Sequence, residues 1–201
     1  MKYNEKLIKA RKTDKNGLLN LLKNNDDIYI VANVANNTNC DLNLLHYIYE
    51  NFEANSFIYT DMVFNKNIDK ELLFLLVKRI IEKDELHNQV DFFESILSDE
   101  KVDKEILIYI LNNVIFYYTK KFILAFFRNI NIDEDIARKL LVKASLNEKI
   151  KLAMSNNKNL SNDFLKEFIN INDKFGIDLE LSLIKRKFVK YDDTTIRMMR
   201  L

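Results

Sequence analysis

Apolar residues recur at helical spacing five times along the chain, each time after the same short polar phrase. The phrase is Asn-x-Asn-apolar-(Asp or Ser), and its copies are NTNCD at 37–41, NKNID at 65–69, DEKVD at 99–103, NINID at 129–133 and NKNLS at 157–161; the third keeps only the ending. Counted from the last residue of each copy, the third, fourth, seventh and eighth following positions are always apolar. These positions form one stripe on a helix of about 3.6 residues per turn, so each copy predicts an amphipathic helix.

The last residue of each copy is suited to begin that helix. Asp and Ser side chains accept a hydrogen bond from a backbone N–H of the first turn, and we therefore expect N-caps at Asp41, Asp69, Asp103, Asp133 and Ser161. The residue before each cap is apolar, as is the residue four positions after it. This pairing is typical of a hydrophobic staple, which fixes the angle at which the chain enters a helix.

Upstream of each phrase lies a shorter apolar segment, such as 28–35 or 122–127, which predicts the first helix of a pair. The opening residue of the phrase is Asn37, Asn65, Asn129 or Asn157, with Asp99 in the third copy. We expect this residue to end the first helix in the left-handed conformation, which Asn tolerates best after Gly.

The cap residues lie 28, 34, 30 and 28 residues apart, a recurrence typical of stacked helical repeats. The predicted fold is all-α, a right-handed α-solenoid of about five helix-pair repeats in one domain spanning residues 1–201. The expected repeats cover about 28–54, 55–88, 89–118, 119–146 and 147–171. Irregular capping helices are expected in 1–27 and 172–201, because terminal repeats are usually atypical.

The segments VANVANNTNCDLNLLHYI at 31–48 and IKLAMSNNKNLSNDFLKEFI at 150–169 resemble α-solenoid repeats of the HEAT and leucine-rich-repeat-variant type. The resemblance covers about 140 of the 201 residues. This chain lacks the prolines of the variant repeat, has a longer spacing, and has no counterpart of the cysteine cluster that can bind iron–sulfur there. The resemblance implies a curved stack of helix pairs whose second helices line one face, and it implies no chemistry.

Composition narrows the class of protein further. Proline is absent and glycine occurs only at positions 17 and 176, which disfavours an all-β architecture. The single cysteine, Cys40, allows no intramolecular disulfide, and a reducing, cytoplasmic location is expected. The N-terminus lacks the apolar core of a signal peptide. The most apolar run, at 106–118, is too short to span a bilayer, so we expect a soluble protein without membrane contact.

Residues for catalysis are few. The two histidines, His46 and His87, lie in different predicted repeats without suggestive partners, and no phosphate-binding loop or metal-ligand motif occurs. Cys40 stands at a staple position, where a buried thiol is more common than a nucleophile. We therefore expect no catalytic residues, no metal, no cofactor and no enzymatic activity.

The strongest binding signal lies five and six positions after the first three caps. His46, Tyr47, Phe74, Leu75, Ile108 and Tyr109 would form an aromatic and aliphatic strip on the second helices. Such a strip is typical of a protein–protein contact surface. The other reading is that neighbouring helices bury these side chains. The first hypothesis is accordingly a non-catalytic scaffold that binds a protein partner through the face of the second helices.

Two further hypotheses rest on charge. The net charge is +1, but residues 51–100 carry −6 and the two following blocks +3 each. The basic half favours a nucleic-acid-binding, DNA-repair-like protein that uses Arg138, Lys139, Lys185, Arg186, Lys187, Lys190, Arg197 and Arg200. The acidic block favours a small inhibitor from a virus or mobile element that blocks a nucleic-acid-binding enzyme through Glu82, Asp84, Glu85, Asp91, Glu94, Asp99 and Glu100.

Overall fold

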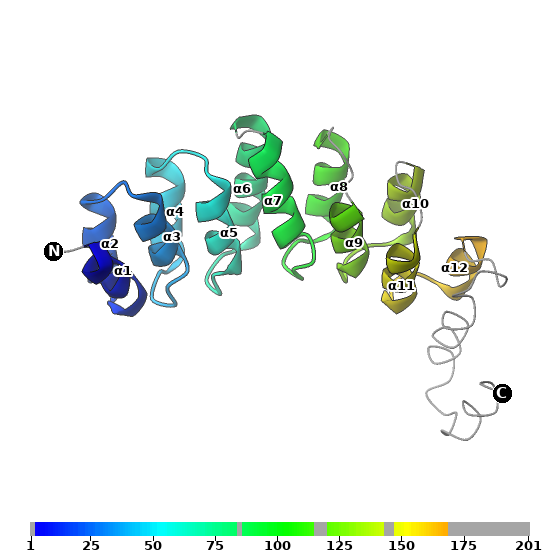
Figure 1. The fold of residues 1–201 in the computed structure, drawn as a ribbon, viewed down its shortest axis with the longest axis horizontal. Helices are drawn as coiled ribbons and strands as arrows, with labels where there is room; N and C mark the ends of the chain where they lie inside the picture. Colours follow the sequence, from blue (N-terminus) through cyan, green and yellow to red (C-terminus); the bar gives the residue numbers. More distant parts are fainter. Residues whose placement is uncertain (1–2, 84–85, 115–119, 143–146, 169–201) are drawn as a thin grey trace, which may run out of the picture. The chain divides into compact units, whose positions relative to one another are not determined.

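The computed structural model describes residues 3–83, 86–114, 120–142 and 147–168, and these ranges contain twelve α-helices and no strand (Figure 1). The helices are α1 (Tyr3–Lys12), α2 (Lys15–Lys23), α3 (Ile28–Ala35), α4 (Leu42–Asn51), α5 (Ser56–Phe64), α6 (Lys70–Lys83), α7 (Leu86–Ile96), α8 (Lys104–Asn113), α9 (Lys120–Arg128), α10 (Glu134–Val142), α11 (Glu148–Asn156) and α12 (Asn162–Phe168). The predicted all-α class is confirmed. The expected C-terminal cap at 172–201 lies outside the described residues.

The chain divides into two compact units. Unit 1 comprises residues 1–96 and 112–116, and unit 2 comprises residues 97–111 and 117–201. The single-domain organisation expected from the sequence stays a prediction. No helix in the described ranges is both long enough and apolar enough to cross a membrane.

Each helix that follows a polar phrase begins directly after the predicted cap. Helices α4, α6, α8, α10 and α12 start at the next residue in every case. The cap side chain accepts a hydrogen bond from the backbone N–H three residues later, over 2.8–3.1 Å, at Asp41, Asp69, Asp103, Asp133 and Ser161. The five N-caps are therefore confirmed.

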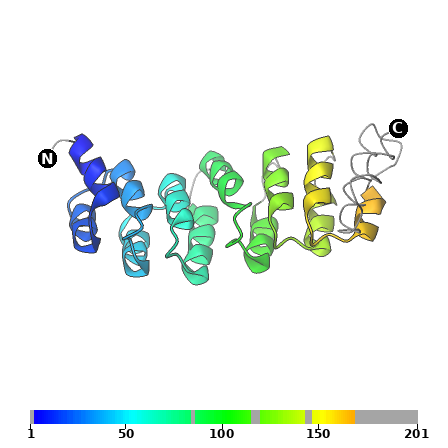
Figure 2. The same ribbon diagram turned by 90° about the horizontal axis from the view of Figure 1, so that it is seen from below.

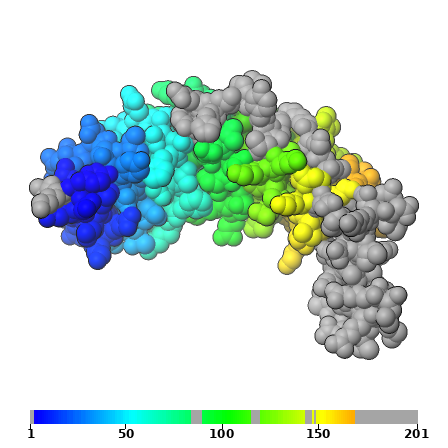
Figure 3. Space-filling model, in the orientation of Figure 1, coloured from blue at the N-terminus to red at the C-terminus, as the bar shows by residue number. Residues whose placement is uncertain are grey.

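The predicted apolar stripes form the core. All of their described positions are buried except Tyr49, Leu141 and Phe168, which are half-buried. The apolar residue before each cap and the one four positions after it are buried in all five copies, as expected for a staple. In the space-filling view, side chains close the gaps that separate the ribbons of helices α1–α6 (Figure 3).

The first helices of the pairs pack against one another within each unit. In unit 1, α1 contacts α3, α3 contacts α5, and α5 contacts α7; in unit 2, α9 contacts α11 (Figures 1 and 2). Described second helices of the same unit contact one another less closely. The first helices thus form the more tightly spaced layer of each unit.

A buried asparagine joins four of the helix pairs to the preceding pair. We call the segments 37–41, 65–69, 99–103, 129–133 and 157–161 the asparagine loops. In unit 1, Nδ2 of Asn65 donates to the carbonyl oxygens of Ala35 and Asn37, at 2.6 and 2.9 Å. In unit 2, Nδ2 of Asn129 donates to Leu97, Asp99 and Val102, over 2.7–3.0 Å. These bonds satisfy carbonyl groups near the ends of first helices, which lack partners within the helix.

Asn37 and Asn157 donate in the same way to backbone carbonyl groups of the preceding helix pair. Asn37 donates to the Ala10 carbonyl at 2.8 Å, and Asn157 donates to the Phe127 and Asn129 carbonyls at 3.1 and 2.7 Å. The Oδ1 atom of each of the four asparagines also accepts the backbone N–H two residues later, over 2.7–3.0 Å. The side-chain N–H groups and the side-chain oxygen of each asparagine both form hydrogen bonds, so these buried polar groups stabilise the interior rather than weaken it.

The left-handed conformation expected for the first asparagine of the phrase is wrong for Asn65 and Asn157. Asn65 has φ −67° and ψ 133°, and Asn157 has φ −81° and ψ 115°, so both have extended backbones rather than left-handed ones. Asparagine is needed here for its side chain, which donates and accepts at once. Asp99 keeps only half of this function: its Oδ1 accepts the N–H of Lys101 at 2.9 Å, but a carboxylate has no N–H to donate.

The expected N-terminal cap is a complete helix pair. Asp14 is the N-cap of α2, and its side chain accepts the Gly17 N–H at 2.9 Å. The loop between α1 and α2 also receives bonds from the next pair, because Asn37 and Asn39 donate to the carbonyls of Ala10 and Thr13.

Candidate functional site

The strip expected on the second helices is half-buried. His46, Tyr47, Phe74 and Leu75 lie in unit 1, and Ile108 and Tyr109 lie in unit 2; all six side chains are neither buried nor fully exposed. The ring of Phe74 is covered by Lys78, whose Nζ lies 4.3 Å from the ring centroid. The strip's role in binding stays a prediction.

The basic residues expected to contact nucleic acid are only partly described. Arg138 and Lys139 are exposed on α10, and the other six lie outside the described residues. Arg138 donates two hydrogen bonds to Glu167, at 2.7 and 2.8 Å, and its guanidinium lies 4.9 Å from the Phe164 ring centroid. The bonds to Glu167 raise the pKa of Arg138 and lower that of Glu167. The charge of Arg138 is thus already paired on the surface.

The acidic residues of the third hypothesis do not form a uniform group. Glu82, Asp91 and Glu100 are exposed and Glu94 is half-buried, whereas Asp84 and Glu85 lie outside the described residues. Asp99 accepts a bond within its own asparagine loop. At least one of these carboxylates therefore has a structural use.

The single cysteine, Cys40, lies in the interior. Burial raises the pKa of the Cys40 thiol to about 12, with a further contribution from the charge of Asp41. Cys40 is fully buried, as its staple position predicts. Among the described residues, no group of three or more His, Cys, Asp and Glu side chains could hold a metal ion.

Among the described residues, the most exposed aromatic side chains lie on the first helices of unit 1, where the sequence did not predict a site. Tyr29 on α3 is 58% exposed and Phe57 on α5 is 50% exposed. Their rings meet edge to face, with centroids 5.6 Å apart and an interplanar angle of 70°. Ile28 and Phe64 on the same two helices are also exposed. We call Ile28, Tyr29, Phe57 and Phe64 the aromatic surface.

The apolar side chains of this surface are additional to those that α3 and α5 bury in the core. Helices α3 and α5 already bury an apolar stripe, namely Ile30, Val31, Val34 and Ala35 on α3 and Ile58, Tyr59, Met62 and Val63 on α5. Neither helix contains a Lys or an Arg. Exposed apolar side chains that lie close together typically mark an interaction surface.

One carboxyl group accompanies the aromatic surface. Phe57, Asp61 and Phe64 stand at i, i+4 and i+7 of α5 and so share one side of the helix. Asp61 is half-buried, and this burial raises the pKa of its carboxyl group to about 6. Among the described residues no cation pairs with Asp61. Its ionised form therefore lacks a partner within the described part of the chain.

The sequence contained a usable signal for this surface. The segment 28–35 is IYIVANVA, in which seven of the eight residues are apolar or aromatic, and this run is too dense for a single buried stripe. The regular phrase points instead to the second helices, where five copies could be aligned.

Comparison of the chain with protein-family models, with curated proteins and with solved structures gives no match.

Proposed function

We propose that the chain is a right-handed α-solenoid of helix-pair repeats that acts as a non-catalytic scaffold for a protein partner. The recurrence of cap, staple and buried asparagine in successive helix pairs supports the repeat architecture. The fold would then belong with the HEAT and leucine-rich-repeat-variant solenoids that the phrase resembles. In such proteins the stacked interior provides stability and the outer faces are free to bind.

The observation that carries the proposal is the edge-to-face pair of Tyr29 and Phe57, both at least half exposed. Aromatic side chains are frequent anchors of protein interfaces because they bury a large apolar area at low entropic cost. The aromatic surface therefore supports binding better than the half-buried strip on the second helices. We place the contact on α3 and α5.

The chemistry of this surface selects a class of partner. An unpaired carboxyl group, Asp61, shares a side of α5 with two exposed phenylalanines, and neither α3 nor α5 carries a cation. A partner segment with apolar side chains next to a Lys or an Arg would cover the rings and neutralise Asp61. Binding of the cation would lower the pKa of Asp61, so a proton would be released on binding near pH 6.

A selection from a random peptide library on the folded protein tests this proposal. We expect enriched peptides that contain apolar residues and at least one Lys or Arg, and their affinity should fall roughly tenfold or more in Tyr29→Ala/Phe57→Ala. Asp61→Asn should weaken the binding of peptides that contain the Lys more than it weakens the binding of their Lys→Gln analogues. The matched control is Tyr47→Ala/Phe74→Ala, which removes aromatic area from the second helices.

Circular dichroism must show that each variant is folded. The aromatic surface would be rejected if the enriched peptides bound Tyr29→Ala/Phe57→Ala as well as they bind the wild type. Loss of binding in Tyr47→Ala/Phe74→Ala instead would transfer the contact to the second helices. Binding of an oligonucleotide that both variants retain and that weakens steeply as salt rises would favour the nucleic-acid alternative.

A further inference from the structure

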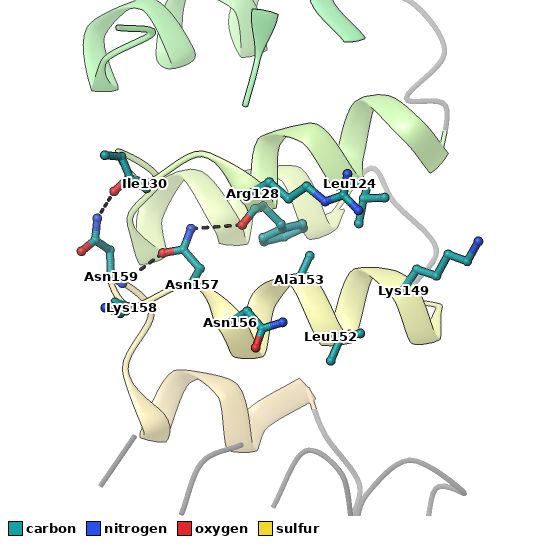
Figure 4. Close-up of a pocket in the computed structure, with 11 residues that line it drawn as sticks. Leu124, Arg128, Ile130, Lys149, Leu152, Ala153, Asn156, Asn157, Lys158 and Asn159 are labelled. Carbon is teal, nitrogen blue, oxygen red and sulfur yellow. Dashed lines mark hydrogen bonds between the residues drawn. The ribbon is translucent and has the colours of Figure 1, made fainter. Parts of the chain in front are cut away.

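A basic and apolar groove lies between the first helices of unit 2. Residues of α9 and α11 and of the asparagine loops that follow them surround a volume of about 820 Å³ (Figure 4). Leu124 and Arg128 come from α9, and Lys149 and Leu152 come from α11. Ile130 and Lys158 lie in the two loops. We call this the α9–α11 groove.

The charge around the groove is of one sign. Arg128, Lys149 and Lys158 line it, and no carboxylate is among the described residues that do. In the described ranges none of these three cations forms an ion pair. Other basic residues do form such pairs: Lys15 with Asp41, Lys104 with Asp133, Arg138 with Glu167 and Lys166 with Asp163. The described part of the groove therefore has a net positive charge.

Apolar side chains are interleaved with these cations. Ile130 is 57% exposed and Leu152 is 53% exposed, and Leu124 is half-buried. The amide of Asn157 is already bonded to the carbonyl oxygen of Phe127, so the loop at one end of the groove is held in place. An occupant must thus offer both negative charge and apolar area.

We propose that the α9–α11 groove binds a protein segment in which Asp or Glu residues alternate with aliphatic or aromatic residues. The carboxylates would pair with Arg128, Lys149 and Lys158, and the apolar side chains would cover Ile130 and Leu152. A single-stranded nucleic acid fits the groove less well, because bases need exposed aromatic rings for stacking. Among the described residues that line the groove, the one aromatic ring belongs to Phe127, which is fully buried. This site is separate from the aromatic surface and does not depend on it.

Titration of a fluorescent peptide of alternating Glu and Leu residues into the full chain tests the proposal. Arg128→Glu/Lys149→Glu should weaken binding about tenfold or more, because it replaces attraction by repulsion at two contacts. Leu152→Ser should weaken binding several-fold without changing its salt dependence, because it removes apolar area alone. A Gln–Leu peptide should bind more weakly than the Glu–Leu peptide, and the difference should shrink as salt rises.

Two control variants make the result specific. Lys23→Glu/Lys66→Glu reverses the same number of exposed charges in unit 1 and should bind the Glu–Leu peptide almost as the wild type does. Tyr29→Ala/Phe57→Ala should also keep this binding, so failure of the groove and failure of the aromatic surface are distinguishable. All residues substituted in these variants are exposed, and thermal melting verifies that the variants fold.

Three results would overturn the proposal. Equal weakening by Lys23→Glu/Lys66→Glu would show a general effect of net charge. Binding that is insensitive to Leu152→Ser and to both charge reversals would place the peptide elsewhere. Oligothymidine that binds more tightly than the Glu–Leu peptide and is lost in Arg128→Glu/Lys149→Glu would assign the groove to nucleic acid.

Discussion

Helices α3 and α5 of unit 1 and helices α9 and α11 of unit 2 have the same kind of buried side and opposite exposed chemistry. All four bury an apolar stripe and are followed by an asparagine loop. The exposed side of α3 and α5 carries aromatic rings, one carboxyl group and no cation. Helices α9 and α11 carry five cations, at positions 120, 121, 128, 149 and 151, and one acid, at 148.

This difference shows which positions the fold constrains. The asparagine side chains and the apolar stripes satisfy backbone carbonyls and fill the core, so they recur in both units. The outward positions meet no such requirement, and their chemistry can differ from one helix pair to another. Two surfaces with different partners can thus be carried on one repeated interior.

The largest expected effect tests whether the interior is equivalent in the two units. Asn65→Asp and Asn129→Asp each direct a carboxylate at backbone carbonyl oxygens in a buried position. Each should lower the free energy of unfolding by about 3–5 kcal/mol, the typical cost of an uncompensated buried charge. Urea denaturation followed by circular dichroism measures the loss. The exposed Asn36→Asp is the control, and a loss no larger than in this control would refute the structural role of the asparagine.

A smaller effect is expected at the N-caps, one from each unit. Asp69→Ala and Asp103→Ala remove the side-chain oxygen that accepts the N–H of Leu72 or Ile106. Each should lower the free energy of unfolding by about 1 kcal/mol, and the corresponding Asp→Asn variants should lose less because Asn is also a good N-cap. Equal losses in the Ala and Asn variants, again from urea denaturation, would contradict the capping role.

The carboxyl group of Asp61, beside the aromatic surface, should make the stability of the protein depend on pH. Burial raises the pKa of Asp61 to about 6 in the folded state, above its value in the unfolded chain. The resulting contribution of Asp61 to stability is fully present below the unfolded-state pKa and is lost as the pH rises through about 6. Asp61→Asn should therefore stabilise the protein at neutral pH by about 1 kcal/mol, a value reduced for the partial exposure of the group. Near pH 4 wild type and variant should melt at similar temperatures. A constant difference at both pH values would contradict the assignment.

The smallest effect concerns the exposed ion pair of Arg138 and Glu167. Glu167→Gln removes the charge of the acid but leaves the fold intact, and exposed pairs contribute little to stability. We expect a melting temperature indistinguishable from that of the wild type, measured at low and at high salt. A clear loss at low salt that disappears at high salt would show that the pair contributes to stability.

The sequence predicts the second helices almost completely. The cap, the staple and the stripe are local patterns, so Asp41 and its four equivalents could be located without a structure. The function of Asn65 could not be found in this way, because its bonding partner Ala35 lies 30 residues earlier in the chain. A local rule therefore assigned the asparagine to a helix end, whereas the tertiary hydrogen bonds determine its role.

The candidate sites were harder to predict than the fold for a related reason. Charge counted in blocks of the sequence mixes Arg138, which is paired with Glu167, with Lys149, which lines an open groove. Likewise Tyr29 and Phe57 are 28 residues apart in the sequence, and their contact follows from the packing of α3 against α5. Only the packing of the first helices brings the members of each site together.

The most direct test of the central claim is a crossed binding titration. A basic–apolar peptide enriched on the wild type and the Glu–Leu peptide are each titrated into the wild type, Tyr29→Ala/Phe57→Ala and Arg128→Glu/Lys149→Glu. We predict that each variant loses one peptide and keeps the other: the first loses the basic–apolar peptide, and the second loses the Glu–Leu peptide. If either variant lost binding of both peptides while remaining folded, or kept binding of both, this would contradict the claim that the protein has two separate binding surfaces of opposite chemistry.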